Sequence, residues 1–158
     1  LTTTVGRADI LVGYLLSFLA FATIQTMVIL SFTVLALQIT YQGELYEIAV
    51  VLMLVVAVSV SLGIFASMFA RNEFQVVQFV PMLFIPQIFL SGVIIPVDQM
   101  PQALEWISKI LPLTYAVNGL REIMLDGQNL ADISSELAII SGFALILLTA
   151  AISTLRRT

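Results

Sequence analysis

The stretch IAVVLMLVVAVSVSLGIFASMFA at residues 48–70 contains no charged side chain, and it decides the fold class. Three more stretches lack charges, at residues 10–43, 74–97 and 137–155, so the four runs are 19 to 34 residues long. A helix of roughly 20 apolar residues is long enough to cross the hydrocarbon core of a bilayer. The pattern therefore predicts an all-α, polytopic membrane bundle with four transmembrane helices.

The composition excludes a soluble globular fold. Hydrophobic residues make up 60% of the 158 residues and charged residues only 10%, whereas soluble domains carry roughly 25% charged residues. We place the four spans at residues 10–37, 48–70, 75–95 and 137–155. The first is too long for a perpendicular helix, so it must tilt or project from the hydrocarbon.

Absent residue types exclude most catalytic chemistry. The chain has no Cys and no His, which excludes disulfides, thiolate nucleophiles, zinc or haem ligation and imidazole acid–base catalysis. Its only lysine, Lys109, has no glycine nearby and belongs to no phosphate-binding loop. The net charge of −4 provides no basic surface for nucleic acid. We therefore predict no catalytic residue, no metal site, no directly bound cofactor and no nucleic-acid partner.

Residues 98–136 differ from the spans, because they hold eight of the sixteen charges. Apolar residues recur at helical spacing over 101–111 and 113–125, and both pieces are too short to cross a bilayer. They predict a short outer amphipathic hairpin, interfacial or re-entrant, between the last two spans. The hairpin residues that we single out are Trp106, Pro112, Tyr115 and Arg121.

The basic residues predict the orientation. Four spans put Arg7, Arg71, Arg156 and Arg157 on one side of the membrane and Lys109 and Arg121 on the other. Cytoplasmic loops carry an excess of Lys and Arg, so we expect the four-arginine side to be cytoplasmic and the hairpin to face outside.

No ionisable residue lies inside the four predicted spans. Ion-coupled carriers and pumps usually place such groups there, so energy for uphill transport must come from a partner. An intramembrane enzyme would need catalytic groups from outside this chain.

The prolines of the third span suggest a protein that changes conformation rather than a static scaffold. Pro81 and Pro86 predict a kinked or broken third span, which ends near Ser91, Gly92 and Pro96. The alternative is that prolines are simply common in membrane helices. Three glutamines in or near the spans either line a substrate path or hydrogen-bond to neighbouring helices; they are Gln25, Gln78 and Gln87.

The order and spacing of one series of residues is distinctive: RNEF at 71–74, Pro81, Pro86, FLSG at 89–92, Pro96, MP at 100–101, LPLTY at 111–115 and LR at 120–121. This series resembles the type-2 ATP-binding-cassette (ABC) exporter permeases. The start of the chain, with LTT at 1–3, Arg7, DIL at 9–11 and Gly13, is similar to the segment that comes after the coupling helix in those permeases.

The resemblance implies a six-span permease half that pairs with a second permease copy. Two cytoplasmic ABC ATPase subunits, separate or fused, would bind the ATP and drive export of drugs, lipids, polysaccharides or other amphipathic cargo by alternating access. The first two spans are missing, so residues 1–158 would form one transmembrane permease domain that is a fragment. It would lie in the plasma (inner) membrane of a prokaryotic cell.

The resemblance also assigns residues to the cytoplasmic surface. Arg7 and Asp9 would lie near the ATPase, while Arg71 and Glu73 would cap the turn into the proline-containing span. Alternatively, Arg71 and Glu73 are interfacial anchors. A different overall interpretation is a non-transporting membrane anchor or regulatory subunit, which the absence of any partner ATPase would favour.

Overall fold

The computed structural model describes residues 7–70 and 72–155, and this part of the chain contains helices and no strand. The helices are α1 (Arg7–Leu35), α2 (Leu45–Ser67), α3 (Glu73–Leu90), the 3₁₀ turn η1 (Val97–Gln99), α4 (Gln102–Ser108), α5 (Pro112–Asp126) and α6 (Ser134–Leu155). Four of them are long and apolar enough to cross a membrane, namely α1, α2, α3 and α6. The predicted polytopic helical bundle is thus confirmed.

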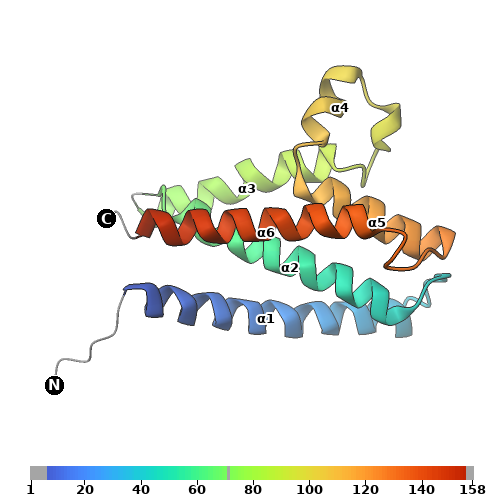
Figure 1. Cartoon of the computed structure of the whole chain (residues 1–158), viewed down its shortest axis with the longest axis horizontal. Coiled ribbons are helices and arrows are strands. Elements are labelled where there is room, and N and C mark those ends of the chain that lie inside the picture. The colour runs from blue at the N-terminus through green and yellow to red at the C-terminus, as the bar shows by residue number, and fades with distance from the viewer. Residues whose placement is uncertain (1–6, 71, 156–158) are drawn as a thin grey trace.

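The long helices run up and down along one axis (Figure 1). The start of α1, the end of α2, the start of α3 and the end of α6 lie at one end of the bundle, which we call the turn end. The α1–α2 and α5–α6 connections lie at the opposite end, which we call the loop end. An antiparallel arrangement follows from the short connections that the sequence predicted.

The four spanning helices begin earlier than predicted, and α1, α2 and α3 also end earlier. Because α2, α3 and α6 start at Leu45, Glu73 and Ser134, the acids Glu47, Glu73 and Glu136 belong to their first turns. The third span was expected to reach Ile95, which is wrong. Ser91 caps α3, and Gly92 adopts a φ of 88°, a left-handed conformation that ends a helix.

The third helix remains continuous through both prolines, so the break considered for it is absent. Pro81 and Pro86 both lie on exposed positions of α3. Each still lacks the N–H that would bond to the carbonyl four residues earlier, at Val77 and Met82. The helix therefore has two unmade backbone hydrogen bonds within one apolar span.

The core forms where α5 inserts between α2 and α6. Near the loop end, Ile123 packs with Ile48, Val51 and Ile133, all at most 2% exposed. Further toward the turn end, Ala116 packs with Val58 and Ile140. Val58 lies thirteen residues after Leu45, on the order of 20 Å along α2. The first turn of α5 therefore reaches the middle of the bundle, which makes α5 a re-entrant helix.

The other half of the hairpin is different. Figure 1 shows α4 beside the end of α3, displaced to one side of the long helices. It contributes no large buried apolar side chain, and Trp106, Ile107 and Ile110 are exposed. Of the two short helices, α5 is re-entrant and α4 is peripheral.

Candidate functional site

A groove of about 820 Å³ separates α1 from α2 toward the turn end. No charged residue lines it; the lining consists of Tyr14, Ser17, Phe18, Phe21, Ala22, Gln25, Val60, Gly63, Ile64 and Ser67. The hydroxyls of Ser17 and Ser67 donate to carbonyls of their own helices, at 2.8 and 2.7 Å. The Gln25 amide and the Tyr14 hydroxyl are the lining polar groups that make no hydrogen bond among the described residues.

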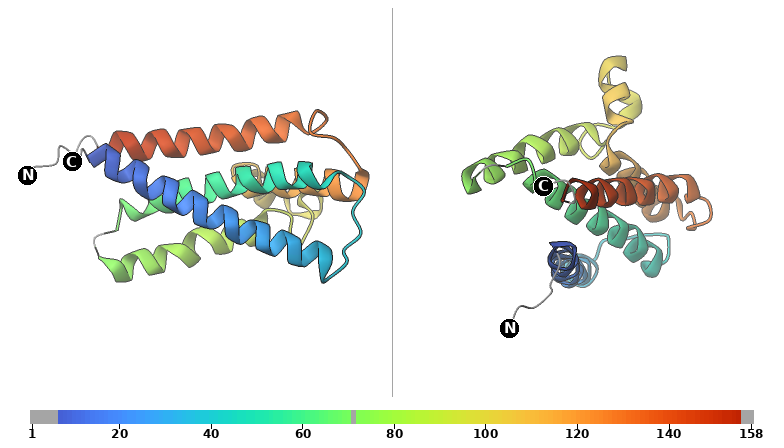
Figure 2. Two further views of the ribbon diagram at one scale, coloured as in Figure 1. Left: turned by 90° about the horizontal axis from the view of Figure 1, so that it is seen from below. Right: turned by 60° about the vertical axis from the view of Figure 1, so that its left-hand side comes forward.

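Helix α1 borders this groove and packs against α2 and α6 without burying a described side chain. Leu30 contacts the cluster around Ile48 and Val51, while no side chain in the described apolar span of α1 is buried. Figure 2 shows α1 at the edge of the bundle. A large apolar surface of α1 is thus left without a protein neighbour in this part of the chain.

The structure does not bring the three predicted path residues together. Gln25 faces the groove between α1 and α2, and Gln78 is exposed on α3. Gln87 is only 8% exposed and lines a separate cavity of about 20 Å³ between α2, α3, α5 and α6. That cavity is too small for an organic cargo molecule.

The residues after α3 form a closely packed turn. Ser91 is fully buried, and its N–H donates to the Gln87 carbonyl at 2.9 Å. A Cβ atom on Gly92 would lie 3.2 Å from Cγ2 of Val97. Pro96 directly precedes η1. The predicted Ser91, Gly92 and Pro96 motif therefore turns the chain out of α3 toward the hairpin.

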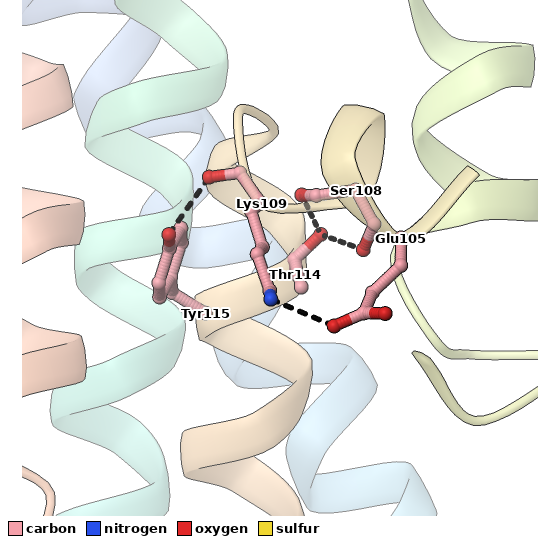
Figure 3. A network of polar contacts seen from close by, with 5 residues as sticks. All are labelled: Glu105, Ser108, Lys109, Thr114 and Tyr115. Carbon is pink, nitrogen blue, oxygen red and sulfur yellow. Dashed lines mark hydrogen bonds and ion pairs between the residues drawn. The ribbon is translucent and has the colours of Figure 1, made fainter. Parts of the chain in front are cut away.

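A hydrogen-bond network fixes the α4–α5 corner (Figure 3). The Thr114 hydroxyl donates to the Ser108 carbonyl at 2.7 Å, which leaves Ser108 Oγ to donate to Thr114 Oγ1 at 3.2 Å. The Tyr115 hydroxyl donates to the Lys109 carbonyl at 2.7 Å. Pro112 is the first residue of α5, where its missing N–H costs nothing. The Ser108 carbonyl also accepts from the Leu111 N–H at 3.0 Å, so these bonds tie the end of α4 to the first turn of α5.

Two cations of the hairpin, Lys109 and Arg121, have different partners. Lys109 pairs with Glu105 at 2.7 Å, and its Nζ lies 5.5 Å from the centre of the exposed Trp106 ring. Arg121 donates from Nη2 to the carbonyl of Gly92 at 2.9 Å. The hairpin is thereby joined to the exit of α3.

The predicted cytoplasmic residues are only partly described. Arg71, Arg156 and Arg157 lie outside the described residues, as do the side chains of Arg7 and Asp9. Glu73 is the exposed first residue of α3.

The cap of α3 comes from a residue that the sequence pattern did not single out. The Asn72 side chain accepts a hydrogen bond from the Gln75 N–H at 2.8 Å. Asn72 is therefore the N-cap of α3. Because Asn is among the strongest N-cap residues, its position just before the predicted span was a usable signal.

Glu47 is a second residue that sequence reasoning missed. Its side chain is only 2% exposed, although it is an acid in the first turn of a membrane helix. The carboxylate accepts from the backbone N–H groups of Glu44 at 3.2 Å and Leu130 at 3.3 Å, and from the Tyr46 hydroxyl at 3.3 Å. Glu47 thereby joins α2 to the α5–α6 connection.

An acidic group lies near the end of α5. Burial raises the pKa of the Glu122 carboxyl above its ordinary value, and the carboxylates of Glu136 and Asp126 raise that pKa further. Among residues 12–70 and 72–151, no three His, Cys, Asp or Glu side chains come together to hold a metal ion.

Comparison with known proteins agrees with this arrangement. The family profile described as "ABC-2 type transporter" matches residues 1–125. The chain is 31% identical over 156 residues to the "Linearmycin resistance permease protein LnrN" of Bacillus subtilis. The aligned region covers 99% of this chain and 40% of that protein. It is 27% identical over 128 residues to the "Probable multidrug ABC transporter permease YbhS" of Escherichia coli K12, covering 80% of this chain and 34% of that protein.

A third relative is the "Nodulation protein J" of Rhizobium leguminosarum bv. viciae, 29% identical over 97 residues, which cover 61% of this chain and 37% of that protein. The chain thus spans at most 40% of the length of these curated relatives. No solved structure matches the chain significantly.

Proposed function

We propose that this chain, which belongs to the ABC-2 type transporter family, forms part of the membrane permease of an ATP-driven exporter. Two permease copies, identical or different, would enclose the path, and ABC ATPase subunits on the cytoplasmic side would bind and hydrolyse the ATP. The permease would move cargo by alternating access.

The main support for this proposal is the absence of charged residues from the middle of the four spans. The acids of the four spanning helices, Asp9, Glu47, Glu73 and Glu136, all lie in first turns rather than at the centre of a span. A proton- or sodium-coupled carrier needs an ionisable group near the centre. A partner that hydrolyses ATP supplies the energy instead, which agrees with the family.

Two of the three glutamines remain candidates for the path. Gln25 lies near the middle of the α1 span and Gln78 in the first half of α3, and both are exposed in this chain. A neutral amide can hydrogen-bond to an uncharged polar group of a cargo molecule without the cost of burying a charge. We assign Gln87, which faces the small cavity, to structure rather than to the path.

The cargo that fits these surfaces is apolar or amphipathic. The groove beside Gln25 has no charged lining residue and a volume of about 820 Å³, within the range of sites for drug-sized ligands. The names of two relatives mention linearmycin resistance and multidrug transport. We extend to this chain only the class of lipophilic organic compounds.

The turn end would face the cytoplasm and the hairpin the outside, as the arginine distribution predicts. The chain contains no Cys. Single cysteines introduced into it therefore report its orientation, provided that any cysteine elsewhere in the full-length protein is replaced. A membrane-impermeant maleimide applied to intact cells should label Asn129→Cys, in the α5–α6 connection, and spare Glu73→Cys. The reverse labelling would overturn the orientation.

Purification of the full-length protein tests the exporter proposal. We expect a P-loop ATPase to co-purify in stoichiometric amount or to be fused to the chain, and mass spectrometry would identify it. A clean preparation without a nucleotide-binding partner would contradict an ATP-driven role. It would favour a membrane anchor or regulatory subunit.

A further inference from the structure

We infer that the small cavity at the first turn of α5 binds a single structural water molecule, held by Gln87 and Ser59. The cavity lies between α2, α3, α5 and α6 and is lined by Val55, Val58, Ser59, Gln87, Pro112, Leu113, Ala116 and Ile140. Two of these side chains are polar, and the others are apolar. The cavity lies at the depth of Val58, in the middle of the bundle.

Gln87 needs a partner at this place. Its side chain is only 8% exposed, and among the described residues its amide makes no hydrogen bond. A buried primary amide without partners is costly, and there is no bulk water in the hydrocarbon core to satisfy it. Among the described residues, no polar side-chain atom is both inaccessible and without a hydrogen-bond partner. The Gln87 amide atoms therefore retain some accessible surface, and Gln87 is one of the residues that line the cavity.

Ser59 supplies the second polar group. Serine hydroxyls in membrane helices commonly donate to a carbonyl of the preceding turn, as Ser61 does to Ala57 at 2.7 Å. Ser59 makes no such bond in the described chain, and it lines the cavity together with Gln87. Leu113, which also lines the cavity, lies in the first turn of α5, where backbone N–H groups have no acceptor within the helix.

The size of the cavity selects the ligand. Its volume is about 20 Å³, and a cavity needs roughly 10–15 Å³ on this measure to hold one water molecule. Larger molecules do not fit, and a metal ion would find no charged ligand among the lining residues. A bound water with two to four polar partners is the usual occupant of such a site.

The water would join three elements at one point. Ser59 is on α2, Gln87 follows Pro86 on α3, and Pro112 begins α5. A bridging water would link α3 to the first turn of α5 through hydrogen bonds that can exchange partners. Such a joint tolerates small movements between α3 and α5 that a direct apolar contact would resist.

Paired variants of the full-length protein in detergent test the site. Gln87→Met and Ser59→Ala should each lower Tm by roughly 2–4 °C, and the double variant should fall no further than the worse single variant. The matched controls are Gln78→Met, exposed on the same helix, and Ser61→Ala, whose hydroxyl bonds within α2. Both controls should leave Tm nearly unchanged. Additive losses, or losses no larger than the controls, would overturn the proposal.

A direct Gln87–Ser59 hydrogen bond would give the same coupling, so a second measurement separates the two. A cryo-electron-microscopy map that resolves ordered waters should show a density peak in the cavity, within hydrogen-bond distance of both side chains. In Gln87→Met this peak should disappear. A map with both side chains ordered and no peak between them would refute the water site.

Discussion

Arg121 donates a hydrogen bond from Nη2 to the carbonyl oxygen of Gly92 at 2.9 Å, across 29 residues of sequence. The bond links the re-entrant helix α5 to the exit of α3. The Gly92 carbonyl lies beyond the helix end, where no α3 amide can reach it. Whatever moves α3 must therefore either move α5 with it or break this bond.

Replacing Arg121 should loosen the hairpin. Arg121→Ala leaves the partly buried Gly92 carbonyl without its donor, which should cost about 1–2 kcal/mol of stability. Lys109→Ala removes an exposed ion pair with Glu105 and should cost less than about 0.5 kcal/mol. Thermal unfolding of the two variants would compare them. Equal losses would mean that the Arg121 bond does not hold the hairpin in place.

Two glycines should resist substitution for different reasons. Gly43→Ala would put a Cβ 2.5 Å from Ile123 Cγ2 and 2.6 Å from the Ile123 carbonyl oxygen, and should cost about 1–3 kcal/mol. Gly92→Ala must adopt a φ of 88° and should cost about 1–2 kcal/mol. Gly142→Ala meets nothing within 4 Å and is the control. Folding yield in detergent and Tm would rank the three, and a neutral Gly43→Ala would contradict the packing of the α1–α2 loop on α5.

The raised pKa of Glu122 gives stability a pH dependence of known sign. Folded Glu122 binds its proton more tightly than the unfolded chain does, because burial and neighbouring carboxylates disfavour its charge. The free energy of unfolding therefore falls as pH rises from the usual glutamate pKa to the raised pKa, and stays lower above it. Glu122→Gln should raise Tm at pH 7, and the gain should vanish below the usual glutamate pKa. A gain of the same size at both pH values would exclude this explanation.

The two prolines should matter more for transport than for assembly. Pro81 and Pro86 leave two carbonyls of α3 without donors and lie on exposed positions. The double variant Pro81→Ala, Pro86→Ala restores both bonds and stiffens the helix. We expect the full-length protein to assemble normally with its ATPase and to lose most of its export activity. Unchanged export would remove any role for the prolines in movement.

Much of the fold was readable from the sequence, because membrane spans are set by length and charge alone. The runs without charge located all four spanning helices, with helix ends displaced by a few residues. The largest error was at the end of α3, where apolar residues continue to Ile95 although the helix stops at Leu90. Hydropathy does not show where a glycine adopts a left-handed conformation. The sequence signal for the end of α3 was the Ser91-Gly92 pair.

The depth of the hairpin was not readable. The apolar spacing of residues 113–125 fits an interfacial helix and a re-entrant helix equally well. Only the packing of Ala116 on Val58 and Ile140 distinguishes the two. The roles of Glu47 and Gln87 were hidden for the same reason, because their partners, Leu130 and the Ser59 cavity, are distant in sequence. Local pattern identifies the helices, and tertiary contact decides what each polar residue does.

The most direct test of an ATP-driven permease is ATP turnover by the partner ATPase, reconstituted in proteoliposomes with and without the full-length permease. Ionophores would be added to collapse proton and sodium gradients. We predict turnover that depends on the permease and persists with the ionophores present. Turnover that is unchanged when the permease is omitted, or that requires an ion gradient, would contradict the claim that this uncharged bundle is driven by ATP.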